Sequence, residues 1–165
     1  FAYVPASLFS SLYKLSDNSV NHRFFVDGPL TAIDYNGSYM LIGGLGHGGQ
    51  GYYALDVTDP TLAASQVVKW EISNNSPGYA NLGFTFSEVA YKTLPNGDKG
   101  LIFANGYGGN GTATLYIANP QNGQRLAFVQ VDGSADNGLS SPVVLDDPKS
   151  DNLVAYAGDV KGNLW

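Results

Sequence analysis

The stretch "LIGGLGHGGQGYYALDVTDP" at residues 41–60 has a second version sixty residues later, "LIFANGYGGNGTATLYIANP" at residues 101–120. Both begin with Leu-Ile, and both end with an acidic or amide residue before proline. When the two are aligned without a gap, glycines coincide at Gly46 and Gly106, Gly48 and Gly108, Gly49 and Gly109, and Gly51 and Gly111. The sequence therefore contains an internal repeat, which is the first clue to the fold.

The flanks of the two copies match as well. "DGPLTAIDYNGSY" precedes the first copy and "TFSEVAYKTLPNGDKG" the second, and each has an apolar strand followed by an Asn-Gly hairpin signal. "QVVKWEIS" and "RLAFVQVD" then follow, with alternating apolar residues typical of half-buried strands. A third copy starts at "SSPVVLDDPKSDNLVAYAGDVKGNLW", where Gly162 takes the place of Gly51 and Gly111. Each unit is therefore predicted to have four short strands.

A repeat of four strands predicts an all-β fold built from the antiparallel blades of a β-propeller. The predicted blades are residues 27–80, 81–138 and 139–165, the last incomplete. About two and a half blades are too few to close a ring, so we expect part of a larger propeller, with the missing blades elsewhere. The chain opens on Phe1 with no recognisable signal peptide, which suggests a processed or truncated piece.

Residues 1–26 do not fit the repeat. "PASLFSSLYKLSD" has apolar residues at near-helical spacing after Pro5, with Ser7 as a possible N-cap, and predicts a short helix from about Ser7 to Leu15. The segment "NHRFFVD" then leads into the first blade. We expect the helix to pack on the side or rim of the propeller.

The composition excludes several classes of protein. A net charge of −6 and a pI near 4.5 disfavour nucleic acid as a partner. Because the chain has no cysteine, disulfides and thiolate metal sites are excluded. No apolar run approaches the roughly 20 residues that span a bilayer. The glycine-rich stretches are not followed by Lys-Ser/Thr or by a helix, so they indicate hairpin loops and not phosphate loops.

The aromatic residues suggest how blades dock. "YALDVTDP" followed by "VVKWE" resembles the repeat of pyrroloquinoline-quinone-type propellers, in which a turn docks against a Trp. Trp70 and Trp165 are predicted to be such packing residues, and Phe128 is predicted to replace Trp70 in the second unit. A stack for a cofactor or sugar is the functional alternative for these rings.

Several stretches together resemble the C-terminal propeller domain of the PilC/PilY family of type IV pilus tip-associated adhesins and assembly factors. The most specific are "HRFFVDG", "GGQGYYALDVTDP" and "YAGDVKGNLW", and the resemblance covers essentially the whole chain. It implies a protein secreted through the periplasm to the bacterial cell surface, at the pilus tip or outer membrane. Minor pilins of the tip complex, and a host-cell or abiotic surface, would be the partners.

The resemblance implies a non-enzymatic role in pilus assembly, retraction control and adhesion. The alternative is a quinoprotein-like scaffold in envelope protein assembly, and a quinone-dependent dehydrogenase fragment is a third hypothesis. Only two histidines occur, His22 and His47, and no pairing with a nucleophile is visible. We expect His47 to be exposed and His22 with Arg23 to make structural hydrogen bonds, with Asp27 as the candidate partner. Asp56, Asp59 and Asp159 at strand ends are predicted to close turns.

The family often carries an Asp-rich calcium loop, whose place in this chain is "LDDPKSDNLVAYAGD". Asp146, Asp147 and Asp151 would be the ligands, with the carbonyl of Leu153. However, Pro148 and Lys149 interrupt the spacing, and the bend has no glycine. A solvated acidic turn is the other interpretation, and no cofactor is expected in this segment. Tyr52, Tyr53 and Tyr107 are candidate contact residues for a partner, and strand alternation predicts that about half of these are buried.

Overall fold

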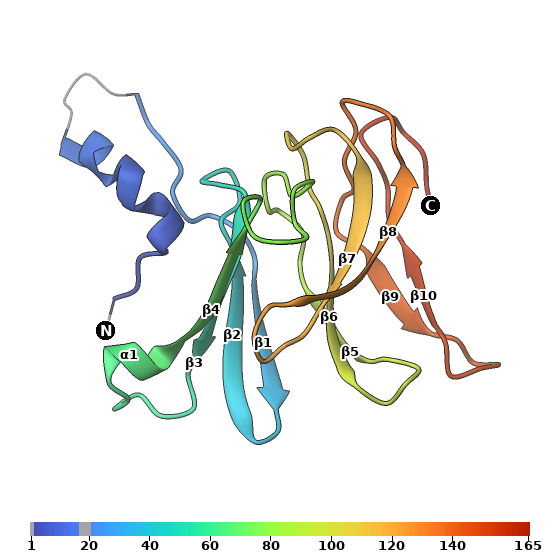
Figure 1. Ribbon diagram of the computed structural model, residues 1–165, viewed down its shortest axis with the longest axis horizontal. Helices are drawn as coiled ribbons and strands as arrows, with labels where there is room; N and C mark the ends of the chain where they lie inside the picture. The colour runs from blue at the N-terminus through green and yellow to red at the C-terminus, as the bar shows by residue number, and fades with distance from the viewer. Residues whose placement is uncertain (1, 17–20) are drawn as a thin grey trace.

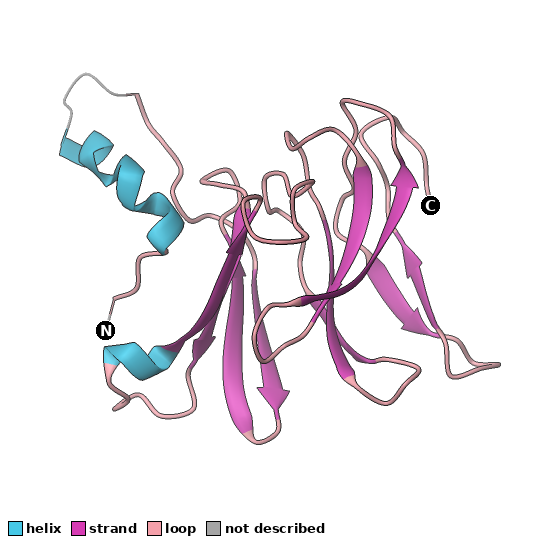
Figure 2. Ribbon diagram, viewed as in Figure 1, coloured by secondary structure: helices cyan, strands magenta, loops and turns pink. Residues whose placement is uncertain are grey.

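The computed structural model describes residues 2–16 and 21–165, so residues 1 and 17–20 of the predicted N-terminal segment lie outside the described residues. Three antiparallel sheets stand side by side in chain order (Figures 1 and 2). The first sheet contains β1 (Leu30–Tyr35), β2 (Ser38–Gly44), β3 (Gly51–Asp56) and β4 (Val68–Ser73). The second contains β5 (Ala90–Thr93), β6 (Lys99–Ala104), β7 (Ala113–Ala118) and β8 (Arg125–Asp132), and the third β9 (Val143–Asp146) and β10 (Leu153–Tyr156).

The helices lie outside these sheets. A 3-10 helix, η1 (Ala6–Ser16), stands where the sequence predicts a helix, and a single turn, α1 (Ala64–Val67), precedes β4. Of the apolar residues on η1, only Leu8 is buried, and Phe9 and Tyr13 are exposed. No helix in the described part of the chain has both the length and the apolar character needed to cross a membrane. The predicted antiparallel four-stranded blades are confirmed.

The two copies of the repeat match residue for residue up to the glycine-rich loop between β2 and β3. After that loop, structurally equivalent residues are offset from the gapless sequence alignment. Ile42 pairs with Ala54 across the first hairpin, whereas its counterpart Ile102 pairs with Ile117 across the second. The second hairpin is therefore longer by three residues. The alignment without a gap is right up to the glycine-rich loops and wrong beyond them, because loop length is free to vary while strand pairing is not.

This shift corrects the predicted place of Phe128. Trp70 pairs with Ala54 on β4, and the residue that pairs with Ile117 on β8 is Ala127. Ala127 therefore has the position of Trp70, and Phe128 points to the opposite face of its sheet. There the guanidinium of Arg125 lies 4.5 Å from the Phe128 ring centroid, and the ring is 46% exposed.

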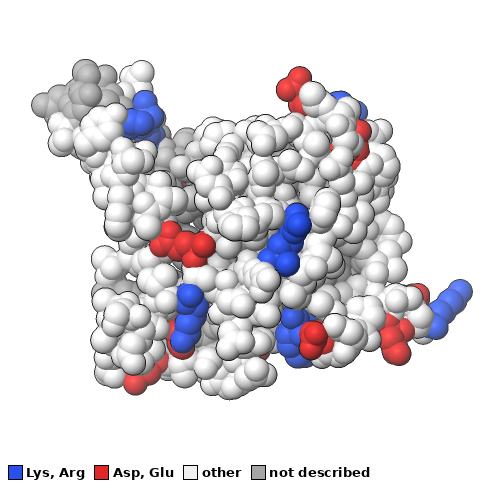
Figure 3. Space-filling model, viewed as in Figure 1, with Lys and Arg blue, Asp and Glu red and all other residues white. Residues whose placement is uncertain are grey.

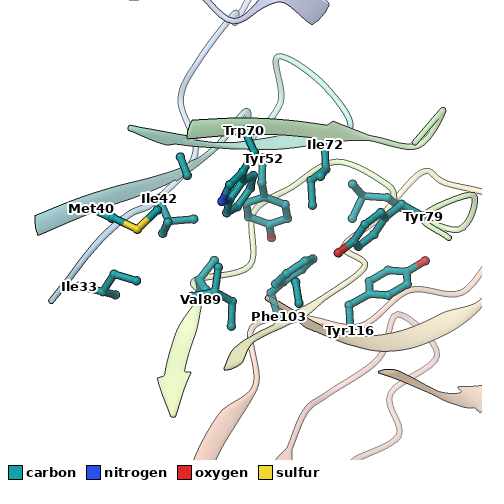
Figure 4. Close-up of a cluster of buried hydrophobic side chains, with 14 residues drawn as sticks. Ile33, Met40, Ile42, Tyr52, Trp70, Ile72, Tyr79, Val89, Phe103 and Tyr116 are labelled. Atoms are coloured by element: carbon teal, nitrogen blue, oxygen red, sulfur yellow. The ribbon is translucent and has the colours of Figure 1, made fainter. Parts of the chain in front are cut away.

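The main core lies between the first two blades (Figure 4). Aromatic rings fill its middle: Tyr52 lies 4.6 Å from Phe103, and Tyr79 lies 5.1 Å from Tyr116, measured between ring centroids. Tilted pairs at these distances add to the burial of their apolar area. Aliphatic side chains, among them Ile42 and Met40, complete the interface. Because each sheet buries one face against its neighbour, neither blade would be stable alone.

At each glycine-rich loop, a backbone hydrogen bond joins one blade to the next. The Gly46 N–H donates to the Thr85 carbonyl at 3.2 Å, and the Gly106 N–H donates to the Leu139 carbonyl at 3.1 Å. Both glycines have positive φ, 60° and 73°, which other residues adopt only with strain. The glycines are therefore repeated because the same blade-to-blade joint is repeated.

The second joint is strengthened by the buried side chain of Asn105. Its amide nitrogen donates to the carbonyls of Asn81 and Thr112, at 3.1 and 2.6 Å. Its amide oxygen accepts from the N–H groups of Thr114 and Leu139, at 3.0 and 3.1 Å. Asn105 is fully buried, and its amide makes all four of its hydrogen bonds within the protein, so this side chain holds three segments in one arrangement.

Trp70 docks as the sequence predicts. Its indole N–H donates to the carbonyl of Pro120 in the second blade at 2.8 Å, and the Gly123 backbone packs on its ring. Trp165 behaves differently. It is 43% exposed, and its indole N–H donates to Asp159 in its own blade at 2.9 Å. That Trp165 docks against a further blade stays a prediction, because the given sequence contains no strand after it.

The N-terminal segment covers the face of the first blade that points away from the second. Leu8 packs in a cluster with Tyr53, Leu55 and other apolar side chains of that face. The Tyr3 hydroxyl donates to Glu71 at 2.6 Å, and the Ala6 N–H donates to the same carboxylate. Burial, and then this hydrogen bond, raise the pKa of Tyr3. The N-terminal segment is thus fixed to the blade by both apolar and polar contacts.

The third blade is bare on its outer face. Val143 pairs with Tyr156, and Leu145 pairs with Val154, so these four apolar side chains stand on one face of the two-stranded sheet. They are between 36% and 61% exposed. Val144, on the opposite face, is buried, and Leu139 and Ala157 of the third blade pack in a cluster with Ala104 and Ala113 of the second.

Candidate binding surface

Loops from several segments meet at one end of the blades, the upper end in Figure 1. They are the residues before β1, the β2–β3 loop, the segment between β4 and β5, and the β6–β7 loop. Six aromatic side chains from these segments form one connected group. We call five of them the aromatic face: Phe24, His47, Phe84, Phe86 and Tyr107. The sixth, His22, meets Phe24 edge-on at 4.7 Å. Loops on a rigid frame commonly carry recognition, so this end is the candidate functional site.

His47 lies at the centre of the aromatic face. Its imidazole stacks on Phe84 at 5.4 Å and 28°, and meets Phe86 edge-on at 5.6 Å. Phe24 flanks the imidazole at 5.4 Å. The backbone N–H of His47 donates to the Asp27 carboxylate at 2.7 Å. His47 is exposed as predicted, but its ring is held in place by three others.

The backbone around the aromatic face is fixed by glycines at close contacts. A Cβ at Gly48 would overlap the Phe25 backbone, and a Cβ at Gly108 would lie 2.9 Å from the Phe84 ring. The Phe84 N–H donates to the Tyr107 carbonyl at 2.6 Å. The rings are therefore presented by loops that are packed and hydrogen-bonded, which lowers the entropy cost of binding.

The three candidate tyrosines do not divide by strand alternation, because both faces of β3 are covered. Tyr52 and Tyr53 are buried, and burial raises the pKa of both. Tyr107 is 37% exposed at the margin of the aromatic face. Only Tyr107 is placed to contact a partner.

The candidate calcium residues are held by other groups. The Asp146 carboxylate lies 2.8 Å from the Lys92 ammonium. Asp147 accepts from the Ser150 hydroxyl at 2.7 Å and from the Lys149 N–H at 3.0 Å, and these hydrogen bonds lower its pKa. Asp151 is exposed on the same turn. Within residues 2–16 and 21–165, no three carboxylate or imidazole groups gather closely enough to hold a metal ion.

The other acidic candidates close turns or pair locally. Asp59 accepts from Thr61, which lowers its pKa, and Asp56 pairs with Lys69 at 2.9 Å. Burial raises the pKa of Asp159, but hydrogen bonds from Asn137, Asn163 and Trp165 outweigh it and hold that pKa well below its usual range. Asp27, the expected partner of His22, instead accepts from His47.

Three residues of the aromatic face were not singled out from the sequence. Phe24, Phe84 and Phe86 come from "NHRFF" and "GFTF", which flank the blades at positions with no strand periodicity. The signal that could have found them is the presence of apolar rings next to glycine-rich loops, where core packing does not require them.

Comparisons with known proteins agree with this geometry. The family model described as the PilY1 beta-propeller domain matches residues 4–165. The chain belongs to this family. Its relatives include the type IV pilus biogenesis factor PilY1 of Pseudomonas aeruginosa, 37% identical over all of this chain and 15% of the relative. A PilY1 homologue of Xylella fastidiosa is also 37% identical, and the chain spans 12% of its length.

The structural comparison shows the same domain. The crystal structure of the Pseudomonas aeruginosa PilY1 C-terminal domain matches with a TM-score of 0.78 and 34% identity. The match covers all of this chain and 33% of that one. The chain is therefore a PilY1-type propeller segment, and it spans only a small part of the curated relatives it matches. Its relatives are factors of type IV pilus biogenesis, which associates this family with the pilus and the cell envelope.

Proposed function

We propose that this segment acts without catalysis at the tip of the type IV pilus, in assembly, in control of retraction and in adhesion. The observation that carries the proposal is the match of the whole chain to the propeller of pilus biogenesis factors. Minor pilins of the tip complex are its proposed partners, and a host-cell or abiotic surface is the proposed target of adhesion. The proposed location is the cell surface, at the pilus tip or outer membrane.

The aromatic face supports a binding role. Interfaces are enriched in aromatic residues, which combine a large contact area with few rotatable bonds. Figure 3 shows charged side chains thinly scattered over the face in view. With low charge and pre-positioned rings, this protein suits contacts that depend on shape and apolar area more than on long-range attraction.

Cross-linking mass spectrometry on purified pili from cells with the full-length parent tests the proposal. We expect cross-links between this segment and pilin-like subunits. Loop residues near Tyr107 lack a lysine, so a photoreactive amino acid at Asn110, which is exposed, supplies the reactive group there. The matched control carries the photoreactive amino acid in place of Lys149, at the opposite end of the blades.

Two outcomes separate the parts of the proposal. If the parent lies in the fibre and this segment cross-links to no pilin, the assembly role is contradicted and adhesion remains. If the parent is absent from pili, the tip location is wrong, and a scaffold role in envelope protein assembly replaces it.

A further inference from the structure

A cavity of about 450 Å³ opens between η1 and the aromatic face. Its walls include Lys14 on η1, Arg23 before the first blade, and the rings of Phe24, His47 and Phe84. Figure 1 shows η1 and the residues from 21 to the start of β1 beside the loop end of the first blade. The volume lies in the range of pockets that hold one small molecule.

The charge of the cavity is opposite to that of the chain. Acidic residues outnumber basic ones by 14 to 8, yet none of the described residues that line the cavity is Asp or Glu. The Asp27 carboxylate lies beside the cavity and accepts a hydrogen bond from the backbone N–H of His47. Two of the eight basic residues, Lys14 and Arg23, line it. Three others, Lys69, Lys92 and Lys161, lie beside aspartates elsewhere. The cavity therefore favours an anion, and ammonium and guanidinium groups bind carboxylates by charge-assisted hydrogen bonds.

The remaining walls suit a compact ring with hydroxyl groups. Phe24 and Phe84 flank His47, each with its ring centroid 5.4 Å from the imidazole, and offer apolar surfaces to a ligand. The C–H face of a sugar ring packs on such surfaces by dispersion and burial of apolar area. The cavity also contains the Ser11 hydroxyl and the imidazoles of His22 and His47. Each of these groups can donate a hydrogen bond to a sugar hydroxyl and accept one from it.

We propose that this cavity binds a carboxylated sugar of the uronic acid class. Lys14 and Arg23 hold the carboxylate, and the Phe24 and Phe84 rings contact the face of the sugar. A peptide fits less well, since the walls are a 3-10 helix and loops with no strand edge for an extended segment to join. The proposal goes beyond the pilus role and does not depend on it.

Titration of the 165-residue chain with D-glucuronate, followed by ¹H–¹⁵N NMR, tests the proposal. We expect shifts at the amides of His47 and Gly48, with a Kd on the order of 1 mM. D-Glucose, which has the same ring without the carboxylate, is expected to bind about tenfold more weakly. Inorganic phosphate separates a sugar site from a simple anion site. If phosphate binds as tightly as glucuronate, the Phe24 and Phe84 rings do not contribute to affinity, and the proposed sugar site is overturned.

Charge-removing variants locate the binding site. Lys14→Gln and Arg23→Gln are each expected to weaken glucuronate binding about tenfold. Lys149→Gln removes an exposed cation on a distant turn and is expected to leave the titration unchanged. Unchanged amide shifts outside the cavity confirm that the variants are folded. If Arg23→Gln alters these shifts, the result for Lys14→Gln, at the half-buried Lys14 of η1, decides. Glucuronate binding that neither variant weakens, or no shift at about 20 mM ligand, would overturn the proposal.

Discussion

The indole N–H of Trp70 in the first blade donates a 2.8 Å hydrogen bond to the carbonyl of Pro120 in the second. Both groups are buried, so neither can exchange this bond for one to water. The turn that carries Pro120 ends at Gly123, where a Cβ would lie 2.9 Å from the indole ring. One side chain thus fixes the lateral distance between two blades and the fold of a turn.

Trp70→Phe is predicted to lower the free energy of unfolding by about 1–3 kcal/mol, because the Pro120 carbonyl loses its donor while most of the ring area stays buried. Urea unfolding measures the change. Trp165→Phe is the matched control: its indole N–H bond to Asp159 is exposed, so water can replace it and a smaller loss is expected. Equal losses in the two variants would contradict the role assigned to the inter-blade bond.

Gly106→Ala is predicted to destabilise the fold by about 3 kcal/mol or more, from backbone strain at positive φ together with a steric clash. The added Cβ would overlap the Phe84 carbonyl oxygen. Gly37 is the control, because its φ is 82° and a Cβ there meets nothing within 4 Å. Gly37→Ala is therefore expected to cost about 1 kcal/mol, from the backbone alone. Thermal and urea unfolding compare the two, and similar losses would rule out the crowded joint.

Acidification is predicted to destabilise the protein between about pH 4 and pH 2, partly through Asp56. Hydrogen bonds from Thr58 and Lys69 hold the pKa of Asp56 at about 2, below the value of about 3.9 expected in the unfolded chain. Its contribution to stability is therefore present above pH 4 and disappears as the pH falls through 2. Asp56→Asn should be less stable than the wild type at pH 6 and nearly equal to it at pH 2. A constant difference in urea midpoint across this range would show that the charge is not responsible.

Calcium is predicted to leave the melting midpoint of this chain unchanged, because Asp146 is paired with Lys92 and Asp147 accepts hydrogen bonds from its own turn. Differential scanning calorimetry with calcium and with EDTA measures this. A ligand that binds only the folded state at about 100 times its Kd would add about 2.7 kcal/mol of stability. A clear rise that Asp146→Asn abolishes would show that the acidic turn does bind calcium.

The glycines and the alternating strands made the blades predictable. Gly46 and Gly106 signal the same joint, and "RLAFVQVD" coincides with β8. The shifted register beyond the loops was not predictable, because the three extra residues lie in a loop whose length carries no packing signal. The exposure of Trp165 also could not be read from its residue type, since the neighbours that bury a tryptophan are set by tertiary contacts.

The aromatic face was hidden for a related reason. Phe24, His47 and Phe84 come from segments far apart in sequence, and only the joints between blades bring them together. His47 read alone is an isolated histidine in a glycine-rich turn. Its place between two rings depends on how the segment before the first blade and the β4–β5 connection pack on that turn.

The N-terminal segment that lies over the first blade gives the row of sheets a direction. One end is sealed by Leu8, Tyr3 and their contacts, and the other presents Val143, Leu145, Val154 and Tyr156 to solvent. In a propeller, each blade covers one face of the blade before it, as the second blade here covers the first. The apolar face of β9 and β10 is therefore expected to be a docking surface for a further blade, and the order of blades around a ring would run away from the N-terminal segment.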